Sequence, residues 1–180
     1  MSGAGPDPFA ALAVLLGYPA GEPDRLTEAV CVLSAAGGEV ARAAARFSEE
    51  IEGMGRGELE ELYTRTFDLD PAASLDVGWH LYGEAYERGR FLVTVRGLLR
   101  EHGIAESGEL PDHLGHVLPL LARMGADEAG PFAERFVAPA LEKMSASLED
   151  TANPYRHVLA AARALVAERF QQPTGEVCHG

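Results

Sequence analysis

Cysteine is scarce in this chain of 180 residues and occurs only at Cys31 and Cys178. Two cysteines do not make the disulfide framework of a small secreted protein. We expect Cys31, which lies in a helical pattern, to be a small buried hydrophobe and Cys178 to be exposed near the C-terminus. This cysteine usage is typical of a reducing compartment.

Long apolar runs and a basic N-terminal segment are also missing. The longest wholly apolar run, residues 9–16, is far shorter than the roughly 20 residues that span a bilayer. The sequence MSGAGPDPF has no basic stretch ahead of an apolar core, so it is not a typical signal peptide. We therefore expect a cytoplasmic protein in which residues 1–8 form a flexible leader.

Positive charge is low, with 15 lysines and arginines against 28 aspartates and glutamates, a net charge of −13 and a pI of about 4.8. So acidic a chain repels nucleic-acid phosphates and anionic membranes, which makes both poor partners. It attracts cationic peptides over distance. The simpler alternative is that the acidic residues only keep the protein soluble.

Common catalytic and nucleotide motifs are missing as well. The chain has no GxGxxG after a strand, no P-loop, no HExxH and no CxxC. The sequence therefore gives no signal for a nucleotide site or for a standard catalytic centre.

Helix-forming residues dominate what is present. Alanine, leucine, glutamate and arginine are abundant, whereas β-branched residues are few. A chain of this length with 47% apolar residues can bury one sizeable core. We predict an all-α, single-domain bundle of about seven to eight helices over residues 9–170, with a hinge or linker at about 101–110 and a flexible tail at 171–180.

Apolar periodicity and proline or glycine punctuation place these helices along the chain. Pro119 and Pro139 lie inside two of the patterns and should kink them, because each removes a backbone hydrogen bond. Asn153 followed by Pro154 is a start signal for the last helix. The expected helices cover about 9–16, 23–36, 40–54, 58–67, 77–101, 111–124, 131–148 and 154–170.

Aromatic and acidic residues are densest in the segment 58–90. A helical pattern stops at Asp68-Leu69-Asp70-Pro71, since proline disfavours a helical conformation of the residue before it. The two aspartates could act as a catalytic acid and base, or Asp68 could form a cap or an Asx-turn. A third interpretation is that exposed carboxylates beside aromatics bind an arginine-bearing peptide.

A second helical pattern follows, with Trp79, Tyr82 and Tyr86 beside its apolar stripe. Aromatics at this spacing are most often core residues, but tyrosine and tryptophan also anchor protein interfaces. Glu84 and Arg88 are four residues apart, and we expect them to form a supporting ion pair on this helix.

Histidine offers an alternative function. His113 and His116 are three residues apart on one helical face, with Asp112 adjacent, which is a possible metal pair. No further ligand pair can be assigned, so the structural interpretation is favoured: Asp112 and His113 form the first turn and tie it to the preceding linker. Cys178 and His179 lie in a tail that gives a catalytic thiolate no fixed environment.

Several motifs resemble one family. They are YTRTFDLDPAASL at 63–75, HLYGE at 80–84 with Arg88-Gly89, and LPDHL at 110–114, together with LLGYP near the N-terminus and NPYRHVL near the end. In this order they resemble the NarJ-type chaperones that assemble the respiratory nitrate reductase, within the all-helical TorD and DmsD family. The resemblance covers most of residues 9–170.

This resemblance implies a TorD-like helical chaperone that is not an enzyme and carries no cofactor or metal. Such chaperones bind the basic amphipathic N-terminal segment of an immature molybdoenzyme catalytic subunit in the cytoplasm, until molybdenum cofactor has been inserted and the complex can dock at the membrane. The implied client is the nitrate reductase alpha subunit. Subunits of selenate, chlorate, dimethyl sulfide and ethylbenzene oxidoreductases are alternatives, and a helical metalloenzyme or a generic acidic interaction module is a competing hypothesis.

The motifs also imply which residues contact the client. An apolar groove would take the apolar face of the peptide helix, and an acidic rim would take its basic residues. Asp112 and His113 correspond to the family's hinge motif and have either a functional or a purely structural role. The expected client-binding residues are Phe67, Asp68, Asp70, Trp79, Tyr82, Glu84, Tyr86 and Arg88.

Overall fold

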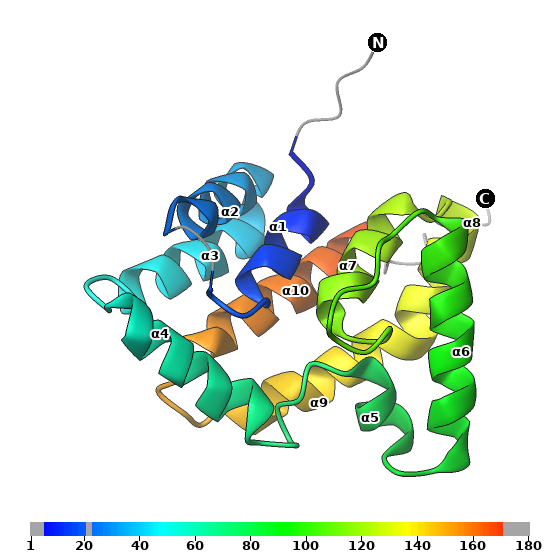
Figure 1. The fold of residues 1–180 in the computed structure, drawn as a ribbon. Coiled ribbons are helices and arrows are strands. Elements are labelled where there is room, and N and C mark those ends of the chain that lie inside the picture. The colour runs from blue at the N-terminus through cyan, green and yellow to red at the C-terminus, as the bar shows by residue number, and fades with distance from the viewer. Residues whose placement is uncertain (1–5, 21–22, 171–180) are drawn as a thin grey trace, which may run out of the picture.

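The computed structural model of the protein describes residues 6–20 and 23–170. In these residues ten α-helices and two π-helical turns pack into one bundle (Figure 1). The described residues contain no β-strand, only an isolated β-bridge between Asp76 and His113. The predicted all-α, single-domain class is therefore confirmed. The elements are α1 Pro8–Leu15, α2 Pro23–Ala36, α3 Gly38–Glu50, α4 Arg56–Tyr63, η1 Thr64–Asp68, α5 Val77–Tyr82, α6 Tyr86–Glu101, α7 Leu114–Arg123, α8 Ala126–Phe132, η2 Ala133–Val137, α9 Ala138–Leu148 and α10 Tyr155–Phe170.

Helix α1 lies inside the bundle, against α2, α7 and α10. It is apolar all round, and Leu12, Leu15 and Leu16 are fully buried, as the sequence predicts. The hydroxyl of Tyr63 donates to the carbonyl of Leu16 at 3.0 Å and so satisfies a backbone acceptor at the end of α1. Burial raises the pKa of Tyr63, which keeps this donor protonated.

Two aromatic clusters fill opposite parts of the core. In the first, Tyr63, Phe67 and Tyr155 pack with ring centroids 4.9–5.9 Å apart, which joins α4 and η1 to α10. In the second, Phe91 packs against Phe132 and Phe136, which joins α6 to α8 and η2. Edge-on, tilted and stacked contacts of this kind stabilise a core beyond the area that they bury.

The long helix expected at 77–101 is divided into α5 and α6, which corrects the sequence prediction. Gly83 ends α5 with φ of +56°, a conformation that other residues rarely adopt. Because the helix turns a corner there, Glu84 and Arg88 do not form the expected pair. The guanidinium of Arg88 instead lies 3.2 Å from the carboxylate of Asp76.

A set of hydrogen bonds fastens residues 75–78 to residues 112–114, and we call it the clamp. The N–H of Val77 donates to the carbonyl of Asp112 at 3.0 Å, and the N–H of Leu114 donates to the carbonyl of Leu75 at 2.9 Å. The N–H of Gly78 donates to the Asp112 carboxylate at 2.7 Å. Asp112 therefore caps α5, whereas the sequence suggested that it begins its own helix; α7 starts only at Leu114.

Several smaller expectations are also settled by the structure. Cys31 is exposed and not buried, because it faces outward on α2. The first eight residues are not all leader, since Asp7 caps α1 through the N–H of Phe9. The expectations for a leader at residues 1–5, for a tail at 171–180 and for Cys178 fall outside the described residues. Within the described residues, no helix is long and apolar enough to cross a membrane.

Candidate functional site

An exposed apolar and acidic area lies on α4 and on the turn that follows it. Leu69 is 73% exposed and Tyr18 is 49% exposed, although both are large apolar side chains. They border a shallow hollow of about 420 Å³. We call this area the α4 surface; the hollow is lined by Tyr18, Gly57, Glu60, Glu61, Thr64, Arg65 and Leu69, and Asp68 and Asp70 flank Leu69 in the chain.

The π-helical turn η1 is what places Leu69 outside. The N–H of Leu69 donates to the carbonyl of Thr64, five residues back, at 3.1 Å. Thr66 is held inward by a hydrogen bond to the carbonyl of Leu62 and by a bond that it accepts from the Asn153 amide, each 2.6 Å long. Turns of this type are frequent at functional sites, because the extra residue redirects the side chains around it.

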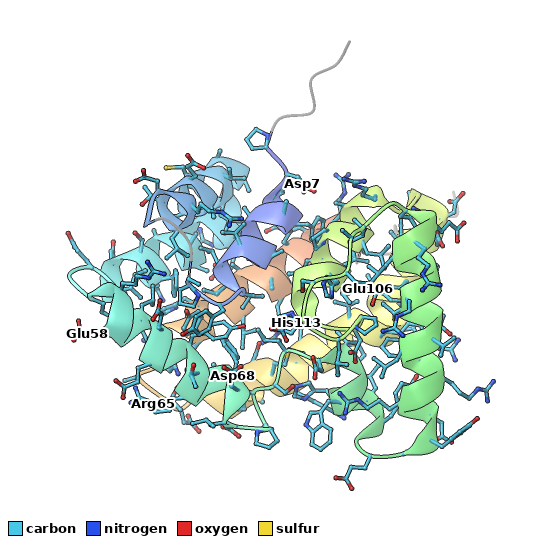
Figure 2. The ribbon with its side chains drawn as sticks, viewed as in Figure 1. Asp7, Glu58, Arg65, Asp68, Glu106 and His113 are labelled. Atoms are coloured by element: carbon cyan, nitrogen blue, oxygen red, sulfur yellow. The ribbon has the colours of Figure 1, made fainter. Side chains whose placement is uncertain are left out.

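Acidic side chains dominate this surface. The stretch 56–70 holds five carboxylates and two arginines. Arg56 pairs with the half-buried Glu60 at 2.8 Å. Arg65 lies 3.9 Å from Glu61, and this second pair is exposed and therefore weak. Figure 2 shows Glu58, Arg65 and Asp68 along the outer edge of α4 and η1.

The break after η1 is held locally, as the sequence predicts, although by a different residue. Asp70 forms the Asx-turn, because its carboxylate accepts from the N–H of Ala72 at 3.0 Å. Asp68 is exposed and makes no side-chain hydrogen bond among the described residues. No base or nucleophile is bonded to either aspartate in that part of the chain, so their arrangement gives no support to acid–base catalysis.

Trp79 and Arg88 lie next to this break and are occupied by contacts within the chain. The indole N–H of Trp79 donates to the carbonyl of Pro71 at 2.8 Å. The guanidinium of Arg88 lies over the Trp79 ring, 5.5 Å from its centroid, while it pairs with Asp76. These two residues fix the loop 69–76 against α5, and each keeps part of its surface exposed.

The remaining predicted client contacts fall on a second area, at the corner between α5 and α6. Tyr86 is 81% exposed, and Glu84 is exposed beside it in the chain. Tyr82 is half-buried, with its ring 5.7 Å from that of Phe91. Figure 1 shows α4 and α6 on opposite sides of the molecule, so the predicted single groove is divided between two surfaces.

Phe67 is the one predicted contact that lies in the core. Its side chain is 6% exposed and packs against Tyr63 and Tyr155. The expectation that it lines an open groove is corrected, because α10 covers it. The sequence analysis did not identify four residues of the α4 surface: Tyr18, Glu60, Glu61 and Leu69. The LLGYP motif could have indicated Tyr18, and the two flanking aspartates could have indicated Leu69.

The predicted hinge residues Asp112 and His113 are buried where residues 112–114 meet the start of α5, and Figure 2 labels His113 there. Burial, followed by the charge of Asp76, raises the pKa of Asp112. One oxygen of Asp112 and the Nε of Arg88 are buried without hydrogen-bond partners. Burial lowers the pKa of His113, whose Nδ1 accepts from the N–H of Gly115 at 3.0 Å and caps α7.

The arrangement of the histidines does not suit a metal pair. The N–H of Ser107 donates to Nε2 of His116 at 3.0 Å, and Nδ1 of His116 lies 2.8 Å from the carbonyl of Leu110. Both ring nitrogens of His116 are therefore engaged in holding the linker to α7. In the part of the chain that the structure describes, no three histidine, cysteine, aspartate or glutamate side chains come together as metal ligands.

Comparison with known proteins now adds to this geometry. Residues 33–161 match the family described as "Nitrate reductase delta subunit". The chain belongs to this family. The match runs from α2 to α10, so it includes all of the α4 surface except Tyr18, and all of α5 and α6.

Curated relatives of the nitrate reductase delta subunit family are similar over part of their length. The chain is 32% identical over 118 residues to the nitrate reductase molybdenum cofactor assembly chaperone NarJ of Escherichia coli strain K12, and equally to that of strain O157:H7. The alignment covers 65% of this chain and 50% of each relative. The chain thus spans about half the length of the curated relatives that it matches.

Proposed function

We propose that this chain is an assembly chaperone for the catalytic subunit of a nitrate reductase that contains molybdenum cofactor. Family membership and relatives named as molybdenum cofactor assembly chaperones support this role. In this proposal the chain is not an enzyme and carries no cofactor or metal of its own. It acts in the cytoplasm, on a client that receives its molybdenum cofactor before the complex docks at the membrane.

We further propose that the client part it binds is a basic, amphipathic N-terminal segment. The observation that carries this step is the α4 surface, on which Leu69 and Tyr18 are exposed among carboxylates. Apolar residues of the segment would pack on these two side chains. Its arginines would form charge-assisted bonds with Asp68, Glu60 and Glu61, and the long-range field would speed encounter.

The path of the segment beyond the α4 surface follows the partly exposed residues. On the chaperone, Asp70 and Pro71 follow Leu69, and the indole N–H of Trp79 donates to the Pro71 carbonyl, which places Trp79 next to this end of the α4 surface. A helix of about five turns is roughly 27 Å long, enough to extend past this break. Tyr82, Glu84, Tyr86 and Arg88 stay predicted contacts at the far end of such a path, and charge reversal at Glu84 tests whether the client reaches them.

The client within the class of molybdenum enzymes is the second part of the proposal. The family description and both relatives name nitrate reductase, and this favours its alpha subunit. The alternative clients are the catalytic subunits of related selenate, chlorate, dimethyl sulfide or ethylbenzene oxidoreductases.

Calorimetric titration with a peptide of about 30 residues from the N-terminus of the client subunit tests the proposal. We expect saturable binding near one-to-one that weakens with added salt, because exposed charges are screened. Asp68→Lys should weaken it about tenfold, since a like charge would face the peptide. Glu28→Lys on α2 is the matched control: this acid is also exposed and unpaired among the described residues, and its reversal should leave binding unchanged.

Two results would contradict the proposal. Equal weakening by Asp68→Lys and Glu28→Lys would show attraction by net charge without a site. No binding of any molybdoenzyme N-terminal peptide, with folded chaperone and intact peptide, would remove the peptide-binding role. Deletion of the gene should leave assembled reductase without molybdenum cofactor, and normal cofactor content would contradict the chaperone role itself.

A further inference from the structure

The outward face of α6 exposes two large apolar residues, with two arginines and a glycine in line with them. Tyr86 is 81% exposed and Val93 is 70% exposed, on a helix that otherwise packs well through Phe91, Val95 and Leu99. Tyr86, Arg90, Val93, Gly97 and Arg100 follow one another at steps of four, three, four and three residues. This is the spacing by which one helix packs lengthwise against another. We call this face the α6 surface.

The α6 surface is open enough for a helix to approach closely. A methyl group added at Gly89 or Gly97 would meet no other atom within 4 Å. Two shallow hollows lie along the helix, of about 410 Å³ beside Tyr82, Phe91 and Phe136 and of about 330 Å³ between Tyr86 and Val93. Apolar side chains of a second helix would have places to enter on both sides of the line.

The charge of this surface is opposite to that of the chain as a whole. Arg90 and Arg135 line the first hollow, and Glu87 is its only acid. Among the described residues neither arginine has an ion-pair partner, whereas Arg88 and Arg96 on the same helix are paired. The guanidinium of Arg135 rests over the ring of Phe136, 5.1 Å from its centroid. Two unpaired cations beside exposed apolar side chains favour an anionic partner at this surface.

We propose that the α6 surface binds an acidic amphipathic helix of a partner protein. Apolar residues of that helix pack on Tyr86 and Val93, and its flanking carboxylates pair with Arg90 and Arg135. The α4 and α6 surfaces require partners of opposite charge. Tyr86 is a predicted contact of both partners, whereas Arg90 and Val93, which test this proposal, are not predicted contacts of the basic segment. A small anion fits the observations less well, since the line from Tyr86 to Arg100 extends for about four turns of helix, beyond either hollow.

A labelled synthetic helix tests the proposal by fluorescence anisotropy. The probe has about 20 residues, leucine and alanine along one stripe and glutamate on the flanks, with blocked ends. We expect saturable binding, which Arg90→Glu and Val93→Ser each weaken about tenfold. The same helix with lysine in place of glutamate should not bind to this face.

The matched control is Arg46→Glu on α3, which reverses an arginine that is exposed and unpaired among the described residues. It should leave the affinity unchanged, and all three variants should keep the circular dichroism of the wild type because the substituted side chains are exposed. No saturable binding to the wild type would overturn the proposal. Equal weakening by Arg46→Glu would also overturn it, since only net charge would then matter.

Two other ligands could occupy the α6 surface in place of the proposed helix, and the experiments distinguish them. If the wild type self-associates in sedimentation experiments and Arg90→Glu makes it monomeric, a second copy of this chain covers the surface. If pyrophosphate displaces the probe and binds equally to Val93→Ser and the wild type, the arginines form a small-anion site. Either result would overturn the proposal, and neither would affect binding of a basic peptide at Asp68.

Discussion

The α4 and α6 surfaces are alike in their exposed apolar residues and differ in the charge that predominates around them. Each exposes two large apolar side chains beside a shallow hollow, Tyr18 and Leu69 on one and Tyr86 and Val93 on the other. Carboxylates surround the first pair, whereas Arg90 and Arg135 accompany the second. In both proposals the exposed apolar residues anchor the partner, and the surrounding charge selects it.

The two surfaces also differ in how they are built. Leu69 is exposed because the π-helical turn η1 and the Asx-turn at Asp70 push the chain outward. Tyr86 and Val93 are exposed because Gly83 ends α5 and lets α6 start in a new direction, with Phe91 facing inward. A local backbone feature therefore sets the first surface, and the orientation of a whole helix sets the second.

The clamp holds α5 in place between the surfaces, so breaking it should have the largest effect. A Cβ at residue 78 would lie 2.7 Å from the Asp112 carboxylate and 2.9 Å from Phe91. We expect Gly78→Ala to lower the free energy of unfolding by about 2 kcal/mol, from overpacking. Urea unfolding measures this, and Gly89→Ala is the control: it has open space and should stabilise α6 by about 0.5 kcal/mol.

Removal of one apolar side chain from each surface gives the sharpest test of the comparison. Leu69→Ser should weaken binding of the basic client peptide about tenfold, or roughly 1.4 kcal/mol, and leave the acidic helix unaffected. Val93→Ser should do the reverse. Both titrations are run on both variants, and a loss of both ligands in either variant would show that the two surfaces are one site.

A smaller effect is expected from the histidine in the clamp region. Burial lowers the pKa of His113 below its ordinary 6.5, so the folded state holds the neutral ring that caps α7. Protons bind the unfolded chain more readily, and stability should fall as the pH drops from about 7.5 to about 5.5. His113→Asn keeps a cap that does not titrate, and should remove up to about 1 kcal/mol of this loss in urea unfolding.

The smallest expected effect concerns Asp112. Burial and the Asp76 charge raise its pKa above the ordinary 3.8, so the folded state takes up a proton more readily than the unfolded chain. The contribution of Asp112 is therefore most favourable in acid and is lost as the pH rises through the raised pKa. Asp112→Asn should gain stability relative to the wild type between acid and neutral pH; a constant difference would contradict the assigned shift.

Much of the fold could be predicted from local features. Few β-branched residues and regular apolar spacing predict helices, and the apolar character of α1 predicts the burial seen at Leu12 and Leu15. Proline predicted the break at Asp70. The corner at Gly83 could not be predicted, because a single glycine inside a helical pattern is often tolerated.

The candidate site was only partly predictable for a related reason. Phe67 and Tyr86 are both aromatic residues beside a helical stripe, yet one is 6% exposed and the other 81%. Tyr155, which covers Phe67, comes from a helix more than 80 residues further along the chain. No local pattern around either residue contains that information.

The sequence by itself determined the helical class, the acidity, the break at Pro71 and the family motifs, because these depend on residue types and on neighbours within a few positions. Tertiary structure alone decided which aromatics are core and which are exposed, that Asp112 caps α5, and that the exposed predicted contacts are divided between two separate areas. Burial and charge pairing depend on contacts between residues distant in the chain, and only the packed bundle brings those residues together.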